Sequence, residues 1–458
     1  MKNYLVCSIC RRRSFLGRLI VLFIFIGIFI QVQYHLFNKK PLETNLQQET
    51  IEINLPVKGR QLACTGDPLK LWCKNVVDFC NSSLSIYQKL FIVTKSIVLQ
   101  PKLAIGKRTG GENVQDVLNQ AEEDEYFKYE KNFLQHSCQI PDLSKNVPVS
   151  QLSNIFTSMT TSNMSSSIEI INRTTIAVTR QDYVNIYHTI TDLYTSYVLC
   201  RFIRKDPKSV QILFLDAHPK GNLDLLWSKM FHSFVRLGHL KNHSSIFYKE
   251  LIWAQPQPTS ELDLQQNHRE SLSFFSDFRE HIIQQFDLNP QLNLEINCQK
   301  LNILFLVRHN YVAHPRNPSG KISRQLENEQ QILSELKTKF SQYPTINFTS
   351  NHFEEMSLQE QLNIVLNTDI FIGIHGAGLT HVVFQKSNRA LIELVPSSAI
   401  GHHFELLSSI NKVRYLRCAI ENGSPQTTEK IFDCIQLKLQ ELCPNMNSMT
   451  ISTNKTNT

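Results

Sequence analysis

The sequence lacks the short motifs that mark several common enzyme and binding classes. It has no G-x-S-x-G nucleophile elbow, no Walker A loop and no G-x-G-x-x-G fingerprint, which disfavours a serine hydrolase and the commonest nucleotide-binding loops. It also lacks helix-turn-helix and zinc-finger spacing, and only 19% of its 458 residues are charged. Since 42% of the residues are hydrophobic, the composition predicts globular domains with a substantial core.

The net charge of +7 does not indicate a nucleic-acid partner, because much of it lies near the N-terminus. Five positive charges precede the uncharged run that begins at Leu19: Lys2, Arg11, Arg12, Arg13 and Arg18. Residues 19–37 are uncharged and, at about 1.5 Å per residue, span roughly 28 Å, enough to cross a bilayer core. The pattern predicts a transmembrane signal anchor, with a cytosolic tail at 1–18 and a lumenal stem at 38–60. A cleaved signal peptide is the alternative, but no small-x-small cleavage site follows the apolar run.

The residues after this anchor suit an oxidising and glycosylating compartment. Nine cysteines follow, and because this number is odd, at least one has no partner within the chain. Their spacing fits no zinc pattern, so we predict disulfides and no metal site among Cys64, Cys73, Cys80, Cys138, Cys200, Cys298, Cys418, Cys434 and Cys443. Seven Asn-x-Ser/Thr sequons predict glycosylation at Asn81, Asn163, Asn172, Asn242, Asn347, Asn422 and Asn454.

Strand and helix patterns alternate in two series after a cysteine-bearing region at 61–150. That region ends in an acidic, helix-like stretch at 121–131, and a Ser/Thr/Asn-rich loop is predicted at 150–168. Strands are predicted at 175–179, 210–215, 246–254, 301–307, 345–348, 370–374, 390–394 and 413–416, and helices at 183–204, 223–237, 327–340 and 358–366. The alternation predicts an α/β fold of parallel sheets. Two Rossmann-like halves, 61–290 and 300–445, are expected to face a cleft at the carboxyl ends of their strands.

The sharpest motif is Asp369–His381 (DIFIGIHGAGLTH). A buried strand runs into a small-residue turn, and a helix is predicted to start near Leu379. Such a turn lets backbone N–H groups approach a phosphate, which makes His375, Gly376, Ala377 and Gly378 candidate nucleotide-binding residues. An ordinary tight turn between strand and helix is the alternative.

Glu393 lies twelve residues past His381, in the apolar strand of IELVP. A carboxylate at the end of such a strand is expected to point toward the same cleft and to bind ribose hydroxyls. A solvated glutamate at a strand end is the alternative.

A basic segment follows the strand predicted at 301–307. Arg308 comes directly after that strand, and its planar fork suits phosphate oxygens. We predict a diphosphate contact for Arg308, with weaker candidates at Arg316, Lys321 and Arg324. A solvated basic loop is the alternative.

No Asp-x-Asp pair occurs in the chain, although metal-dependent nucleotide-sugar enzymes commonly hold their cation with one. The absence favours a site in which arginines and helix dipoles replace the metal. We therefore expect no cofactor, and no essential divalent ion.

The first series carries a possible acid–base pair. His188 and Asp192 are four residues apart, so on a helix they share a face. Asp192 is expected to orient His188 as a general base, or to act as the base itself. Arg180 and Asn185, in the same segment, are candidates for the acceptor side. A structural i,i+4 hydrogen bond is the alternative.

Three segments together resemble the plant-type core β-1,2-xylosyltransferases, within a wider family of lumenal enzymes that includes the EGF-domain O-GlcNAc transferases. They are VTRQDYVNIYHTITDLYTSYV, LFLVRHNYVAHPRNPSGKISRQLENE and DIFIGIHGAGLTHVVF, followed by IELVP and HHFELL. The resemblance covers roughly residues 170–420. One departure is His309, which follows Arg308 where relatives are expected to have a second basic residue.

This resemblance implies a GT-B-like fold, an inverting mechanism, UDP-xylose as donor and the 2-hydroxyl of the core β-mannose of N-glycans as acceptor. It also implies a Golgi enzyme of type II topology, held in the membrane by its N-terminal helix. Two alternatives stay open: an O-GlcNAc transferase acting on Ser or Thr of secreted domains, and an inactive lumenal glycan-binding protein.

Overall fold

The structure is a computed structural model of the chain. Contacts divide the chain into two compact units, Met1–Lys58 and Gly59–Thr458. The structure describes parts of the second unit: residues 72, 76–87, 91–138, 151–162, 169–254, 262, 270–288, 295–396 and 401–445. The predicted tail, anchor and stem, together with Cys64, Cys73, Asn163 and Asn454, lie outside the described residues. Among the residues that are described, no helix is both long and apolar enough to span a membrane.

The C-terminal sheet contains five parallel strands in the order β14-β13-β15-β16-β17. Its strands are β13 (Leu301–Val307), β14 (Ile346–His352), β15 (Ile370–Ile374), β16 (Ala390–Val395) and β17 (Arg414–Ala419). The central three are nearly continuous apolar runs, which is typical of strands buried on both faces. Because β14 and β15 lie on opposite sides of β13, the winding reverses there, and the carboxyl ends of β13 and β15 form a switch point.

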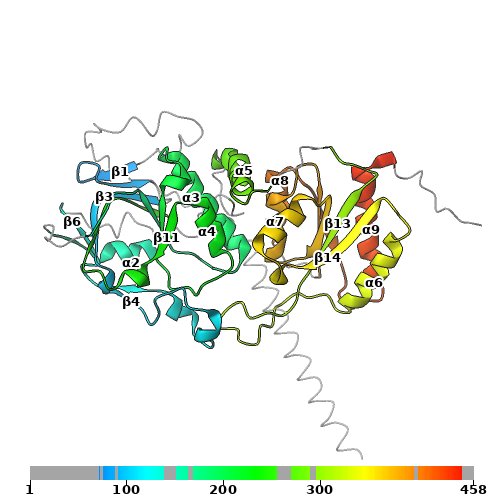
Figure 1. Ribbon diagram of the computed structural model, residues 1–458, viewed down its shortest axis with the longest axis horizontal. Helices are drawn as coiled ribbons and strands as arrows, with labels where there is room; N and C mark the ends of the chain where they lie inside the picture. Colours follow the sequence, from blue (N-terminus) through cyan, green and yellow to red (C-terminus); the bar gives the residue numbers. More distant parts are fainter. Residues whose placement is uncertain are drawn as a thin grey trace, which may run out of the picture. The chain divides into compact units, whose positions relative to one another are not determined.

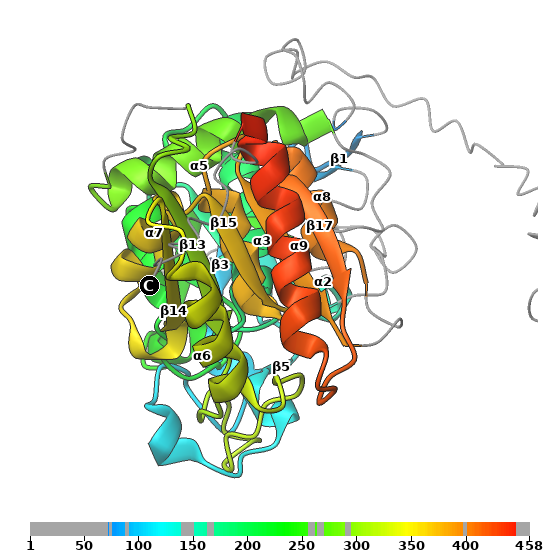
Figure 2. The ribbon, with the colours of Figure 1, turned by 90° about the vertical axis from the view of Figure 1, so that its right-hand side faces the viewer.

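Helices cover both faces of this sheet. Helices α6 (Glu329–Phe340) and α9 (Thr427–Leu442) lie over one face, as Figure 2 shows. The other face packs against α7 (Leu358–Leu366), the 3₁₀ helix η10 (Ala377–Phe384) and α8 (His403–Ile410). Strand β13 serves both layers, because its residues alternate: Leu304 and Leu306 join the α7 side, while Ile303 and Phe305 join the α6 side.

The N-terminal sheet, on the left in Figure 1, is mixed, with the main strand order β1-β2-β3-β12-β9-β10-β11. Strands β12 (Ile246–Ala254), β9 (Thr175–Val178), β10 (Gln211–Phe214) and β11 (Ser233–Arg236) are parallel. The prediction of an all-parallel sheet is wrong for the other side of β12. There the antiparallel strands β1 (Val76–Phe79), β2 (Leu84–Tyr87) and β3 (Phe91–Leu99) extend the sheet. Shorter strands are β4 (Ala104–Ile105), β5 (Lys128–Tyr129), β6 (Leu134–His136), β7 (Met159–Thr161) and β8 (Glu169–Ile171).

Helices α3 (Ile186–Phe202) and α4 (Asp224–Met230) pack on one face of the N-terminal sheet, and α5 (Phe275–Gln285) packs against both of them. Helix α2 (Gln151–Thr157) packs on the other face. The helix predicted at 223–237 is wrong beyond Met230, because the next residues form the edge strand β11, paired with β10. The helix-like stretch at 121–131 contains only a 3₁₀ turn, Glu122–Glu125, and β5. The loop predicted at 150–168 contains helix α2, and α9 was not predicted.

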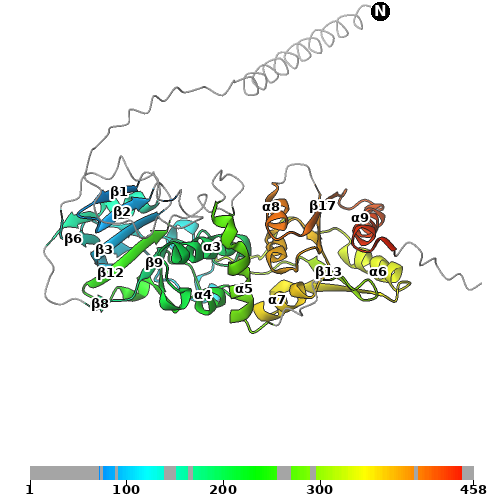
Figure 3. The same cartoon turned by 90° about the horizontal axis from the view of Figure 1, so that it is seen from above.

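One hydrophobic core continues from the helices of the N-terminal sheet to those of the C-terminal sheet. Helices α3 and α5 both contact η10, and Figure 3 shows α5 between α4 and the α7–α8 layer. Leu193 and Phe278 belong to the same buried cluster as Val383 and Phe384. Each such side chain stabilises the fold by roughly 1.5–3 kcal/mol, so this shared packing fixes the surfaces that carry the candidate site.

Six of the predicted disulfide cysteines are paired, which confirms the disulfide prediction for them. Cys298–Cys443 joins the segment before β13 to the end of α9, and Cys418–Cys434 joins β17 to α9. Cys80–Cys138 joins the β1–β2 turn to the residues after β6. Cys200 is unpaired and buried in α3, in agreement with the odd count.

Of the sequon asparagines in the described part of the chain, Asn81, Asn172, Asn242 and Asn347 are exposed. Asn422 is half-buried: its Nδ2 donates to the carbonyl of Gln325, and its Oδ1 accepts from the N–H of Glu327. A glycan on this nitrogen competes with the first bond, so Asn422 is the least suitable acceptor of the five.

Candidate functional site

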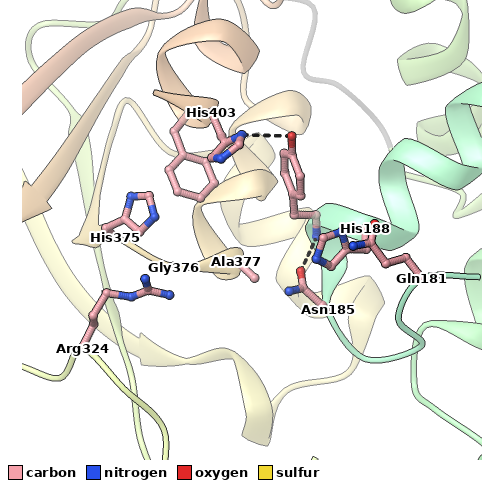
Figure 4. A pocket seen from close by; sticks show the side chains of 10 residues that line it. Gln181, Asn185, His188, Arg324, His375, Gly376, Ala377 and His403 are labelled. Carbon is pink, nitrogen blue, oxygen red and sulfur yellow. Dashed lines mark hydrogen bonds between the residues drawn. The ribbon is translucent and has the colours of Figure 1, made fainter. Parts of the chain in front are cut away.

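A cavity of about 320 Å³ lies where the start of α3 faces the C-terminal sheet. Its walls come from α3, the segment after β13, the turn after β15 and the start of α8. The lining residues are Gln181, Asn185, Tyr187, His188, Arg324, His375, Gly376, Ala377, His403 and Phe404. Figure 4 shows Arg324 and His375 on one side of the cavity, with Gln181, Asn185 and His188 on the other. Six predicted site residues therefore meet here: His188, Asn185, Arg324, His375, Gly376 and Ala377.

Arg308 reaches the turn after β15 from the neighbouring strand β13. Its Nη1 donates to the carbonyl of His375 over 2.9 Å. A Cβ on Gly376 would lie only 1.9 Å from the same Nη1, so glycine is needed for the arginine to approach the backbone. The glycine at this position is therefore explained by the closeness of Arg308. Gly378 is different: a Cβ added there would lie 2.6 Å from Cδ2 of Leu306, and Gly378 does not line the cavity.

Arg308 and Arg324 form a local concentration of positive charge. Burial lowers the pKa of the half-buried Arg308, and the charge of Arg324 lowers it further. Neither arginine forms an ion pair with any carboxylate in the described part of the chain. Arg324 also holds a left-handed backbone conformation, with φ of 59°, which costs a non-glycine residue about 1 kcal/mol or more. Two close guanidinium groups without carboxylate partners are suited to a multiply charged anion.

Glu393 is fully buried and does not face the cavity, contrary to the prediction that it binds ribose. One carboxylate oxygen accepts from Nδ1 of His375 and the other from the hydroxyl of Tyr415. Glu393 lies in the middle of β16, paired with Gly373 of β15, and its strand position explains the burial. The carboxylate thus orients His375 and leaves the other ring nitrogen for the cavity. Burial, then Glu393, raises the pKa of Tyr415, so its phenol stays a hydrogen-bond donor.

The α3 side of the cavity begins at the helix N-terminus. Asn185 is the N-cap of α3: its Oδ1 accepts from the N–H of Tyr187, and the extended segment before the helix ends there. The Tyr187 hydroxyl lies 3.1 Å from Nδ1 of His403 at the start of α8, so the two walls are joined directly (Figure 4). Sequence reasoning assigned no role to Gln181, Tyr187, His403 or Phe404. The HHFELL segment was the available signal for the last two.

Arg180 is buried inside the N-terminal half and is not on the acceptor side, contrary to prediction. Its guanidinium contacts Asp216 at 2.7 Å and Asp224 at 2.9 Å, and its side chain is 1% exposed. Arg236 approaches the same Asp224 at 2.6 Å. A buried cation held by two carboxylates is a structural unit whose disruption is costly.

Asp192 does not line the cavity, so it is not positioned as the base. Its carboxyl accepts from the N–H of Gln181 over 3.3 Å. Burial raises the pKa of Asp192 to about 8, so the group is protonated at neutral pH and carries no charge to couple to His188. Of the predicted pair, only His188 reaches the cavity.

We expect Asp192 to make stability fall as pH rises. Its pKa is about 8 in the folded chain and about 3.9 when unfolded. Between these values the native state holds a proton that the unfolded state lacks, so the free energy of unfolding decreases by about 1.4 kcal/mol per pH unit. Asp192→Asn keeps the shape of the side chain but cannot titrate. Urea unfolding of both proteins is measured at pH 5 and pH 7. From pH 5 to pH 7 the unfolding free energy of the wild type should fall relative to that of the asparagine variant. Parallel changes in the two proteins would contradict the assignment.

The rest of the predicted basic segment packs against the N-terminal half. Arg316 lies 3.7 Å from Glu122 and 3.8 Å from Glu125, so it is not at the cavity. Lys321 is exposed and also lies outside the lining. His314 contacts Asp182 at 3.4 Å; although burial opposes it, this contact and backbone hydrogen bonds lower the pKa of Asp182.

The chain thus combines a doubly wound sheet, a cationic turn at its switch point and an opposing helix that carries a histidine, an arrangement suited to an anionic leaving group. Residues 186–392 match the family model Glycosyltransferase 61. This match confirms the resemblance seen in the sequence.

Relatives with assigned names include two plant enzymes. The chain is 29% identical over 275 residues to a beta-1,2-xylosyltransferase from Oryza sativa subsp. japonica, covering 56% of this chain and 51% of the relative. It is 26% identical over 294 residues to a beta-1,2-xylosyltransferase from Arabidopsis thaliana, covering 57% and 54%. The chain therefore spans about half the length of these relatives.

An animal relative and a solved structure complete the comparison. An EGF domain-specific O-linked N-acetylglucosamine transferase from Pan troglodytes is 26% identical over 220 residues, covering 46% of this chain and 38% of the relative. A mutant flavo di-iron protein from Thermotoga maritima matches with a TM-score of 0.24 at 14% identity, covering 44% of this chain and 46% of that chain. That likeness carries no structural argument.

Proposed function

We propose that this chain is an inverting glycosyltransferase that moves xylose from UDP-xylose to the 2-hydroxyl of the core β-mannose of N-glycans. The observation that carries the proposal is the placement of Arg324 and the His375–Ala377 turn across the cavity from His188. Arg308 does not line the cavity, but it holds the same turn through its bond to the His375 carbonyl. The guanidinium pair suits a diphosphate, and the glycosyltransferase family supplies the reaction class. The choice of xylose and of an N-glycan is supported by the named plant relatives.

In this proposal the two halves divide the substrates, as in a GT-B-like enzyme. Residues 300–445 bind UDP through Arg308, Arg324 and the turn at His375–Ala377. Residues 61–290 present the acceptor to the cavity from the start of α3. The division is supported by the switch point between β13 and β15, where open α/β sheets bind their ligands.

The proposed reaction is a single displacement at the anomeric carbon. The acceptor oxygen bonds to this carbon while His188 takes its proton as general base. The bond from the carbon to the β-phosphate oxygen breaks, and UDP leaves with the electron pair. Arg308, Arg324 and the His375 ring held by Glu393 stabilise the negative charge on the leaving phosphate. Attack opposite the leaving group inverts the anomeric carbon.

The proposed setting is the Golgi lumen, with the chain anchored by residues 19–37 in type II orientation. The disulfides agree with an oxidising compartment. We propose that transfer needs no divalent ion, because arginines occupy the positions beside the turn.

A second candidate function is O-GlcNAc transfer to Ser or Thr of secreted domains, favoured by the match to the chimpanzee enzyme. Both reactions use the same UDP-binding half, so the donor sugar separates them. The deciding experiment measures UDP release by the purified full-length chain with UDP-xylose, UDP-GlcNAc, UDP-glucose and UDP-galactose. Each donor is offered once with an N-glycan that exposes core mannose and once with a secreted domain that exposes Ser and Thr. Release with UDP-xylose alone supports the proposal. Release only with UDP-GlcNAc, and only on a Ser/Thr acceptor, assigns the second function. Silence with every donor and acceptor supports a glycan-binding protein.

A further inference from the structure

Two histidines and a glutamate meet at the end of the C-terminal sheet, outside the cavity. His309 comes two residues after β13, and His352 is the last residue of β14, opposite Val307 in the parallel pairing. Glu354 follows in the short turn after β14. One potential ligand atom from each of the three residues lies within 4.8 Å of the others. The cluster therefore arises from neighbouring strand ends and does not depend on a single flexible loop.

The two histidine rings converge on one carboxylate oxygen. Nδ1 of His309 lies 4.0 Å from Oε1 of Glu354, and Nδ1 of His352 lies 3.9 Å from the same oxygen. These distances are too long for hydrogen bonds. Two ligands bound at about 2.1 Å to one ion are separated by roughly 3.4 Å in tetrahedral geometry and by about 4.2 Å at most. The observed separations fall within that span.

The surroundings of the His309 and His352 rings also suit metal ligands. Nδ1 of His352 is buried and forms no hydrogen bond within the described residues, although a buried polar atom normally has a partner. The rings of His309 and His352 are stacked, with centroids 3.7 Å apart, so the two potential ligands are held beside each other.

A second carboxylate lies beside the other ring nitrogen of His309. Nε2 of His309 lies 3.5 Å from Oε1 of Glu329, while its Nδ1 faces the cluster. A metal-binding histidine usually donates its other ring N–H to a carboxylate, which fixes the tautomer and the ring orientation. The backbone N–H of His309 also donates to Glu354 over 3.2 Å. The two carboxylates balance the charge of a divalent cation.

We propose that His309, His352 and Glu354 bind one Zn²⁺ ion at the carboxyl edge of β13 and β14. Two imidazoles and one carboxylate are a ligand set that suits zinc better than magnesium. The His309 side chain is 49% exposed, which leaves a fourth position for water. The ion joins the ends of two strands and fixes the residue that follows Arg308. Its role is structural, and the proposal does not depend on the proposed transfer reaction.

The test is zinc binding by the purified full-length chain after removal of metal with a chelator. Zn²⁺ is titrated in competition with a chromophoric zinc indicator, and thermal unfolding is recorded with and without Zn²⁺. We expect one ion per chain and a higher Tm with zinc, with Mg²⁺ having no such effect. His309→Ala and His352→Ala should each lose the site, and Glu329→Gln should weaken it about tenfold or more. His243→Ala, which removes an exposed histidine paired with Glu169, is the matched control and should bind as the wild type does.

Either of two results would overturn the proposal. One is a wild-type chain that binds no more zinc than the His309→Ala or Glu329→Gln variant. The other is a zinc-dependent rise in Tm that persists in both of these variants. Because His309 and Glu329 are partly solvent-facing, these variants keep the test valid if His352→Ala fails to fold. The readouts are metal content and Tm, so an inactive transferase would leave the zinc result unchanged.

Discussion

Arg308→Ala is expected to lower kcat/KM for sugar transfer by about 10²–10³-fold, the loss typical of removing one donor that stabilises transition-state charge. Arg308 is already held at the turn by its bond to the His375 carbonyl, so little ordering is needed when a diphosphate binds. Arg308→Lys should recover only part of the activity, because an ammonium group cannot reproduce the planar fork. UDP affinity, measured by calorimetry, should weaken in the same order: wild type, Lys, Ala.

Arg173→Ala is the matched control for this experiment. Arg173 is an exposed arginine whose guanidinium reaches only the Ser209 carbonyl, at 3.4 Å. Its loss should leave both UDP affinity and turnover within about twofold of the wild type, since isolated surface contacts contribute little. If Arg308→Ala kept wild-type UDP affinity and turnover, the phosphate site would have to lie elsewhere.

His188→Ala should lower kcat by about 10²–10⁴-fold, the usual contribution of a positioned general base, while UDP affinity stays within about twofold. The separation follows from the geometry: His188 projects from α3, across the cavity from Arg324 and His375 (Figure 4). His375→Ala should behave differently and weaken UDP binding as well, because its ring belongs to the turn that we propose receives the phosphates.

Kinetics and calorimetry on the same preparations provide the check, with His243→Ala as a histidine control far from the cavity lining. Wild-type kcat in His188→Ala would remove this residue from the mechanism. An equal loss of UDP affinity and turnover in His188→Ala would instead place it on the donor side.

The second series of strands was predictable because its signals were local. The runs at 301–307, 358–366 and 370–374 are apolar stretches with clear ends, and the structure has β13, α7 and β15 over the same residues. The first sheet was harder to predict. Strand β3 pairs with β12 on the side away from β9, and β2 and β1 follow it in the sheet. The antiparallel pairing of β3 with β12 over such a sequence distance leaves no local pattern.

The site residues were likewise predictable where the signal was local and not where it depended on distant partners. Arg308 and Gly376 followed buried strands, and a strand end fixes where the next residue lies. Glu393 was misplaced because a glutamate inside an apolar run reads equally as a strand end or as a buried partner, and only its bonds to His375 and Tyr415 decide between them. Asp192 shares a helix with His188, but helical spacing cannot show that burial keeps its carboxyl neutral. Arg180 was misplaced because its partner Asp216 lies 36 residues away in the sequence.

The measurement that tests the central claim most directly is linkage analysis of the product formed by the full-length chain. The chain is incubated with UDP-xylose and an N-glycan with exposed core mannose, without added divalent metal, and the glycan is examined by mass spectrometry and NMR. The account predicts a mass increase of one pentose and a new β-linkage on the 2-hydroxyl of the core mannose. An unmodified glycan, or a pentose attached at any other position of the glycan, would contradict it.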